Sequence, residues 1–190
     1  MWYPQTVTVS PASEPVTLAE AKAHCRVDGS DEDTRINGFI AAARGYVEGH
    51  CGIAIASRTV TIKCDSFSDF DAFPGVPLLA VLSISYTDSA GTTQTLPSSV
   101  YEVRSDGLTA SIALKYQQAW PSIQPGSRIT VTASIGYAET PAELKQALLL
   151  VIGDWYRSRE DTTIGVGITQ TPQLPHGVSA LLANFRRFCF

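Results

Sequence analysis

The stretch that decides the fold is TPAELKQALLLVIGDWYRSRE, from Thr140 to Glu160. Thr140 suits the N-cap of a helix, Pro141 suits the first helical position, where no amide donor is needed, and Glu143 completes a capping box. Apolar residues then recur at steps of three and four, which predicts a helix with one buried stripe over about residues 141–158. The stripe comprises Leu144, Ala147, Leu148, Val151, Ile152 and Trp155. We expect this helix to be a scaffold and not a reaction centre.

Three more helices are predicted outside this stretch. Thr17 and Glu20 form a second capping box, which predicts a helix over about residues 17–26. The next helix is expected over residues 31–51, capped by Ser30 or Asp31 and stopped by Gly52. A short helix is expected over residues 178–186. The residues that we expect to form the core scaffold of these helices are Ile36, Phe39, Ile40, Val47, Leu144, Leu148, Val151 and Trp155.

From about residue 57 to residue 137 the helical period gives way to β-branched alternation, which is typical of strands. The clearest runs are Thr59 to Cys64 and Arg128 to Ala133, and short turns separate the runs between them. Short connections favour antiparallel pairing in a small sheet or barrel-like sandwich. The predicted fold class is therefore α+β, with a helical domain made of residues 1–56 and 138–190 and an antiparallel β-rich insertion of residues 57–137.

Composition narrows the class of function. The chain has 190 residues, 44% of them hydrophobic, and a formal net charge of -4. Proteins that bind nucleic acid along their surface need clustered Lys and Arg, so the negative net charge disfavours a nucleic-acid-binding surface. No apolar run approaches the roughly 18 residues that a bilayer crossing needs, and the first residues do not resemble a signal peptide. We expect no membrane partner and synthesis in the cytosol.

Catalytic and metal-binding patterns are weak. The four cysteines contain no C-x-x-C pair, and His24-Cys25 and His50-Cys51 are sequence neighbours, whose side chains diverge on a helix. The acidic run from Asp28 to Asp33 lacks the spacing of an EF-hand loop. No nucleophile motif and no phosphate-binding glycine loop occurs. We therefore expect no metal, no cofactor and no enzymatic activity.

Two segments are candidates for contacts with other molecules. Residues 161–177 have the composition of a mobile loop, yet Ile164, Val166 and Ile168 alternate with small residues, so the segment could instead pair as an edge strand with a neighbouring subunit. At the C-terminus, three aromatic residues and two arginines form an amphipathic tail that either docks on a partner or folds back onto the core. The residues of this tail are Phe185, Arg186, Arg187, Phe188 and Phe190.

Aromatic residues allow a second interpretation of the β region. Tyr116 and Trp120 could form a stacking platform for a carbohydrate or protein ligand, in which case the chain would be a monomeric binding module. The same residues could instead fill the core or cover the edge of a sheet. We favour packing, because large rings next to turns commonly serve that purpose.

Taken in order, several short motifs resemble the head-tail connector proteins of tailed bacteriophages, of the type that forms the adaptor ring beneath the portal. The likeness begins with PVTLAEAK from Pro15 and continues with the helix around Ile40, with Tyr101-Glu102-Val103 and with Trp120-Pro121. The remaining motifs are Ile135-Gly136-Tyr137, Pro141 to Ala147, Trp155-Tyr156-x-x-Arg159-Glu160 and Leu181-Leu182-x-x-Phe185-Arg186. Each motif alone is weak, but their shared order spans nearly the whole chain.

The resemblance implies a structural protein of the virion, assembled in the bacterial cytoplasm at the head-tail interface. It implies a closed ring of identical subunits, a dodecamer in the particle, that joins the portal protein to a stopper or tail-completion protein. DNA would pass through the ring without specific binding, which suits a mildly acidic chain. The C-terminal tail would then be the portal-docking segment, and Ile164, Val166 and Ile168 would lie at the interface between subunits. Removal of all residues after Ala183 is expected to abolish attachment to portal-bearing heads.

Overall fold

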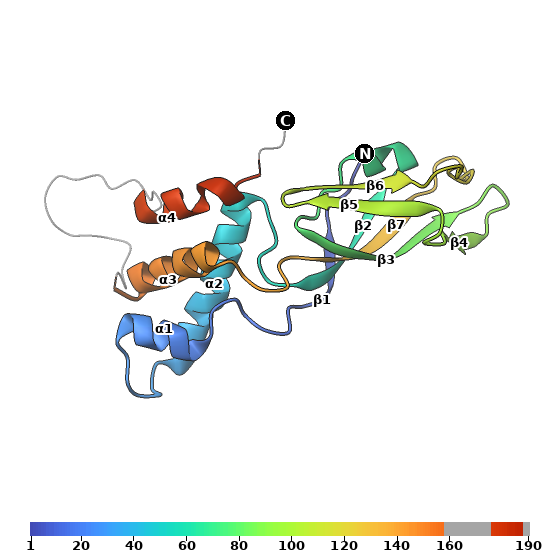
Figure 1. Ribbon diagram of the computed structural model, residues 1–190. Coiled ribbons are helices and arrows are strands. Elements are labelled where there is room, and N and C mark those ends of the chain that lie inside the picture. The colour runs from blue at the N-terminus through green and yellow to red at the C-terminus, as the bar shows by residue number, and fades with distance from the viewer. Residues whose placement is uncertain (158–175, 188–190) are drawn as a thin grey trace, which may run out of the picture. The chain divides into compact units, whose positions relative to one another are not determined.

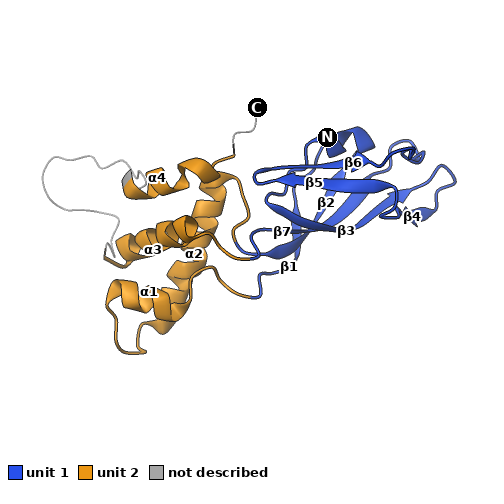
Figure 2. Cartoon of the chain, viewed as in Figure 1, with its two compact units in different colours: residues 1–12, 56–138 blue, residues 13–55, 139–190 orange. Residues whose placement is uncertain are grey.

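The computed structural model describes residues 1–157 and 176–187 (Figure 1). The chain forms two compact units, shown in different colours in Figure 2. The first, here called the β unit, comprises Met1–Ala12 and Ala56–Ala138, and the second, the helical unit, comprises Ser13–Ile55 and Glu139–Phe190. Helices and antiparallel strands thus occupy separate parts of the chain, and the predicted α+β class is confirmed.

The β unit is built on a five-stranded sheet and a two-stranded sheet in which every pair of strands is antiparallel. In spatial order the large sheet contains β1 (Thr6–Val9), β2 (Arg58–Cys64), β7 (Ile129–Ile135), β3 (Leu78–Thr87) and β4 (Thr93–Thr95). The small sheet pairs β5 (Tyr101–Asp106) with β6 (Thr109–Leu114). The two runs that the sequence analysis placed, Thr59 to Cys64 and Arg128 to Ala133, correspond to β2 and β7 within two residues.

The division of the chain differs from the expected one at its N-terminus. Residues 1–12, which the sequence analysis grouped with the helices, belong to the β unit because β1 pairs with β2 through Thr6–Thr61 and Val7–Val60. The partner strand lies about fifty residues further along the chain. Local sequence does not reveal such a pairing.

The core of the β unit lies on one face of the large sheet. Along β7, isoleucine, valine and alanine side chains are buried, whereas Thr130, Thr132 and Ser134 alternate with them and are half-buried. An aromatic cluster around the 3₁₀ helix η1 (Phe67–Asp71) adds to this core. In that cluster Trp2 stacks on Phe70 with ring centroids 5.8 Å apart. Gly136 directly follows β7; its φ is +107° and a Cβ would lie 2.6 Å from the carbonyl oxygen of Ala56, so only glycine fits.

The helical unit contains α1 (Leu18–Cys25), α2 (Asp33–Cys51), α3 (Ala142–Arg157), α4 (His176–Leu182) and the 3₁₀ turn η2 (Ala183–Phe185). The capping box of α1 is present: the Glu20 amide donates to the Thr17 hydroxyl, and the Thr17 amide donates to the Glu20 carboxylate. Gly52 ends α2 in the left-handed conformation, as predicted.

Two helix starts differ from the expectation. α2 begins at Asp33 with Glu32 as its N-cap, and no side chain caps it, so neither Ser30 nor Asp31 has the expected role. The Ser30 carbonyl instead accepts a hydrogen bond from the Asp33 amide, which forms a turn ahead of the helix. α3 begins at Ala142, and the Pro141 carbonyl accepts the amide of Lys145. Pro141 therefore occupies the cap position that we expected for Thr140.

Candidate assembly surfaces

The eight residues predicted as core scaffold divide into two groups. Six are buried among the helices, namely Ile36, Ile40, Val47, Leu144, Leu148 and Val151. Phe39 and Trp155 are only half-buried. Phe39 lies beneath the Arg35 guanidinium at 5.6 Å, and Trp155 meets Tyr46 edge to face at 5.8 Å. These two aromatic side chains lie at the rim of the bundle.

A buried carboxylate organises one end of the helical unit. Glu48, which is 9% exposed, accepts a hydrogen bond of 2.8 Å from the amide of Ile55 and lies 3.3 Å from an Arg44 nitrogen. Arg44 also forms a two-pronged ion pair with Glu14, at 2.7 and 3.2 Å, and the paired carboxylates raise the pKa of its guanidinium. Glu14 and Ile55 lie near the two ends of the segment Ser13–Ile55, and the network connects both of them to α2. The sequence analysis did not identify it.

Two more ion pairs join α1 to its neighbours. Lys145 of α3 donates to Glu20 at 2.7 Å, and this contact, with the amide and hydroxyl of Thr17, lowers the pKa of Glu20 to about 2. Lys22 donates to Asp33 and to the Gly29 carbonyl, each at 2.6 Å.

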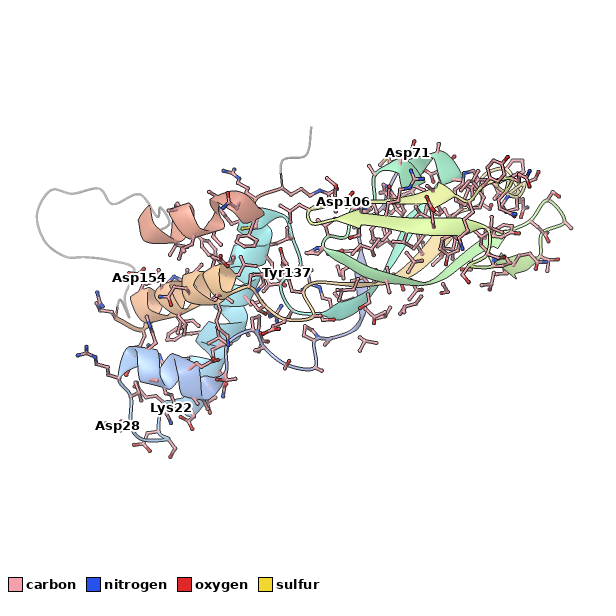
Figure 3. All side chains as sticks on the ribbon, in the orientation of Figure 1. Lys22, Asp28, Asp71, Asp106, Tyr137 and Asp154 are labelled. Carbon is pink, nitrogen blue, oxygen red and sulfur yellow. The ribbon has the colours of Figure 1, made fainter. Side chains whose placement is uncertain are left out.

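The Lys22 contacts bear on the acidic turn that was considered as a calcium site. Figure 3 labels Lys22 and Asp28 at this end of the helical unit. The ammonium of Lys22 contacts the Gly29 carbonyl and the Asp33 carboxylate, so the positive charge beside these oxygens of the turn comes from the lysine. Among the described residues, no three His, Cys, Asp or Glu side chains converge as metal ligands would.

Two of the cysteines have the character of core side chains. Cys51 and Cys64 are buried, and burial raises the pKa of both, that of Cys64 to about 12. Thiols in this state are poor nucleophiles at neutral pH.

In the described parts of the chain, none of the helices is both long enough and apolar enough to cross a bilayer.

Part of the predicted docking tail is described. Phe185 ends η2 and is half-buried, Arg186 is exposed, and Arg187 is half-buried. The amide of Arg187 donates to the Cys51 carbonyl at 2.8 Å. Phe188 and Phe190 lie outside the described residues, as do Ile164, Val166 and Ile168 of the predicted subunit interface. The structure therefore gives the start of the tail and its attachment to α2.

The two aromatic residues of the alternative ligand platform are in different environments. Trp120 stacks on Phe67 with centroids 4.8 Å apart and an angle of 2° between the planes, and it meets Phe70 edge to face. One face of the indole is thus covered by protein. Tyr116 is 89% exposed. The structure therefore favours packing over ligand stacking for Trp120. Among the described residues, its rings contact Phe67 and Phe70, and no ring contact joins it to Tyr116.

The β unit exposes apolar side chains that the sequence analysis did not single out. Val7 and Val9 of the edge strand β1 are exposed, and so are Leu79 and Leu82 at the two register shifts of β3. Bulges of this kind displace the alternation, so an apolar run such as residues 78–82 does not bury every side chain. The alternation of Thr6–Val9 was the one sequence signal that could have revealed β1.

Comparisons with known proteins show what the chain is similar to. The model of the head completion protein family matches residues 14–188, and the chain belongs to this family. The predicted class, a head-tail connector of a tailed phage or phage-like particle, is thereby confirmed. The comparison with curated proteins gave no match.

Solved structures of a phage-like particle share the fold. A chain in the neck of an empty GTA particle, computed with C6 symmetry, has 21% sequence identity and a TM-score of 0.80, over 99% of this chain and 97% of that one. A chain in the virion of a native gene transfer agent (GTA) particle has 21% identity and a TM-score of 0.78, over 98% and 96% of the two chains. A chain in the neck of the native GTA particle, computed with C12 symmetry, has 20% identity and a TM-score of 0.68, over 96% and 97%. At such low identity the likeness establishes the fold.

Proposed function

We propose that the chain assembles into a closed ring in the neck of a tailed phage or phage-like particle, where it joins the head to the tail as a structural component without catalysis. The observation that carries this proposal is the match of the head completion family over residues 14–188, which includes nearly all of the helical unit and residues 56–138 of the β unit. The likeness to neck chains over almost the full length of both molecules supports the same location.

A ring of identical chains needs two different complementary faces on each subunit, whose repeated rotation closes the circle. The similar chains come from necks computed with C12 and C6 symmetry, which supports a dodecamer in the particle. We propose a portal protein on one side, a stopper or tail-completion protein on the other, and DNA passing through the lumen. The net charge of -4 supports passage of DNA without binding, because a duplex is not attracted to an acidic wall.

We propose that two segments of the chain contact the portal and the neighbouring subunit. The C-terminal tail, Phe185 to Phe190, docks on the portal, and residues around Ile164, Val166 and Ile168 contact the neighbouring subunit. Phe185 belongs to η2 and is half-buried, so removal of residues after Ala183 would also disturb the bundle. A truncation after Arg187 is the sharper variant, because it leaves all described residues in place.

The experiment that tests the ring is complementation of particles that lack the chain. We expect particles without it to contain filled heads and unattached tails, and the wild-type chain to restore joining. Electron microscopy of the restored necks should show one ring of this chain between head and tail. Normal joining without the chain, or its absence from purified necks, would overturn the proposal. The mass in solution alone is a weaker test, since closure can require the portal as a template.

A further inference from the structure

The last described residues of the chain rest on the C-terminal end of α2. The amide of Arg187 donates to the carbonyl oxygen of Cys51 at 2.8 Å. Cys51 is the final residue of α2, and the last four carbonyls of a helix have no partner within it. The backbone of the tail therefore supplies a donor to a carbonyl that the helix itself cannot satisfy.

Gly52 makes room for this contact. Its φ of +68° is in the left-handed region, and a Cβ built on it would lie 3.7 Å from the Arg187 Cβ and 3.9 Å from the Arg187 oxygen. A methyl group at those distances would be in ordinary van der Waals contact with Arg187, and a side chain that extended further in that direction would press on the tail. Gly52 thus ends α2 and also leaves the space in which Arg187 lies.

Charge supports the same placement. The C-terminal end of a helix carries partial negative charge, which favours nearby cations. Burial raises the pKa of the Cys51 thiol, and the positive charge of Arg186 partly opposes this rise. Upstream, α4 is held by the fully buried side chains of Val178 and Leu182. The chain is therefore anchored on both sides of Arg186 within the helical unit.

We propose that Cys51 and Gly52 form a tail seat, which fixes the point and direction at which the docking tail leaves the helical unit. The inference rests on the proposed docking of that tail on the portal. A segment held at its base loses less conformational freedom on binding than one that is free from α4 onward, so the seat raises affinity without touching the partner. Gly52 and the Arg187 amide are positioning groups in this scheme.

The decisive comparison is Arg187→Pro against Arg187→Ala. Both variants lack the guanidinium, but only proline lacks the amide that donates to Cys51. Arg186 already has φ -82° and ψ 120°, the extended conformation that a residue before proline adopts, so proline introduces no conflict upstream. We expect attachment to portal-bearing heads to weaken at least tenfold more in the proline variant than in the alanine variant, with the two melting temperatures within about 2 °C.

A second pair of variants tests the space above Gly52. Asparagine tolerates positive φ, so Gly52→Asn keeps the helix end but adds a side chain whose Cβ already contacts Arg187. Gly107→Asn is the matched control, because Gly107 has φ +60° with nothing within 4 Å of an added Cβ. We expect Gly52→Asn to weaken attachment about tenfold and Gly107→Asn to leave it within twofold of wild type.

The outcomes separate the seat from the docking itself. If truncation after Arg187 leaves attachment unchanged, Phe188 and Phe190 do not contact the portal, and the proposed docking of these two residues is wrong. If truncation abolishes attachment but the proline and alanine variants bind equally, the tail docks without a seat and this inference is overturned. Equal losses for Gly52→Asn and Gly107→Asn would overturn it as well.

Discussion

The two units of the chain are stabilised in different ways. The β unit relies on an aromatic cluster, in which Trp2, Phe67, Phe70 and Trp120 contact one another, and on buried aliphatic side chains of the large sheet. The helical unit also has an apolar core, but its elements are joined by ion pairs, Arg44 to Glu14 and Glu48, and Lys145 to Glu20. Salt and pH should therefore alter the helical unit more than the β unit.

This difference matters because the helical unit carries the start of the docking tail. Its charged contacts fix segments that are distant in sequence, such as Glu14, Ile55 and α3. Hydrophobic packing is non-directional, whereas a hydrogen-bonded ion pair defines a geometry. Apolar packing therefore stabilises the β unit, whereas ion pairs in the helical unit hold its chain segments at defined positions. Four predictions test the comparison.

The largest effect is expected from Phe70→Ala in the β unit. Phe70 is fully buried and contacts three aromatic rings, so its truncation should lower the free energy of unfolding by about 3–5 kcal/mol. Denaturant melts followed by tryptophan fluorescence would measure the loss, since Trp2 and Trp120 lie in this unit. The loss of unfolding free energy should depend little on salt concentration. A loss that varied strongly between low and high salt would contradict the contrast between the units.

The second prediction concerns the buried carboxylate of the helical unit. Glu48→Ala leaves the Ile55 amide without this acceptor and removes one carboxylate from Arg44, so we expect a loss of about 3 kcal/mol, at the lower end of the range for breaking a buried pair. Circular dichroism at 222 nm during urea unfolding would follow the helices. Glu48→Gln keeps an oxygen acceptor and should cost less. Glu102→Ala on β5, whose partner Arg104 is exposed, is the control and should change stability by under about 0.5 kcal/mol.

Local sequence signals predicted much of the fold. The capping box of Thr17 and Glu20, the stop at Gly52 and the stripe of α3 all depend on residues within one or two helical turns, and all are present. The strand β1 was missed because its position is set by pairing with β2, far along the chain. The start of α2 was wrong because the Asp33 amide donates to the Ser30 carbonyl in a turn, and the helix begins after this turn without a side-chain cap.

The candidate site was less predictable. The tail was recognised from its composition, but its contact with Cys51 joins residues more than one hundred positions apart, and no periodicity encodes that distance. The network of Glu14, Arg44 and Glu48 also depends on the folded chain bringing two segments to α2. Contacts between subunits remain a prediction, since their geometry is set by other copies of the chain.

The third prediction concerns the rim of the helical bundle. Trp155 was expected to be a core residue, for which truncation to alanine would cost about 3–5 kcal/mol. Because the side chain is half-buried against Tyr46, we now expect Trp155→Ala to cost about 2 kcal/mol. Tyr46→Ala is the matched variant, and a double-mutant cycle should show a coupling of about 0.5–1.5 kcal/mol between the rings. A loss above about 4 kcal/mol in denaturant melts would show that Trp155 belongs to the core after all.

The smallest effect is expected from the exposed ion pair between α1 and α3. The pKa of Glu20 is lowered from 4.5 to about 2 by Lys145 and Thr17, so the carboxylate contributes stability above its unfolded pKa, and this contribution is lost as pH falls from about 4.5 towards 2. Since the side chains of Lys145 and Glu20 are 37% and 39% exposed, solvent screening should limit the contribution to about 0.2–1 kcal/mol. Glu20→Gln retains an acceptor for the capping box, so it isolates the charge. We expect the variant to be slightly less stable than wild type at pH 6, with a difference that is reduced in high salt and shrinks as pH falls towards 2; a difference that persists unchanged at pH 2 would mean that Glu20 acts through its shape and not through its charge.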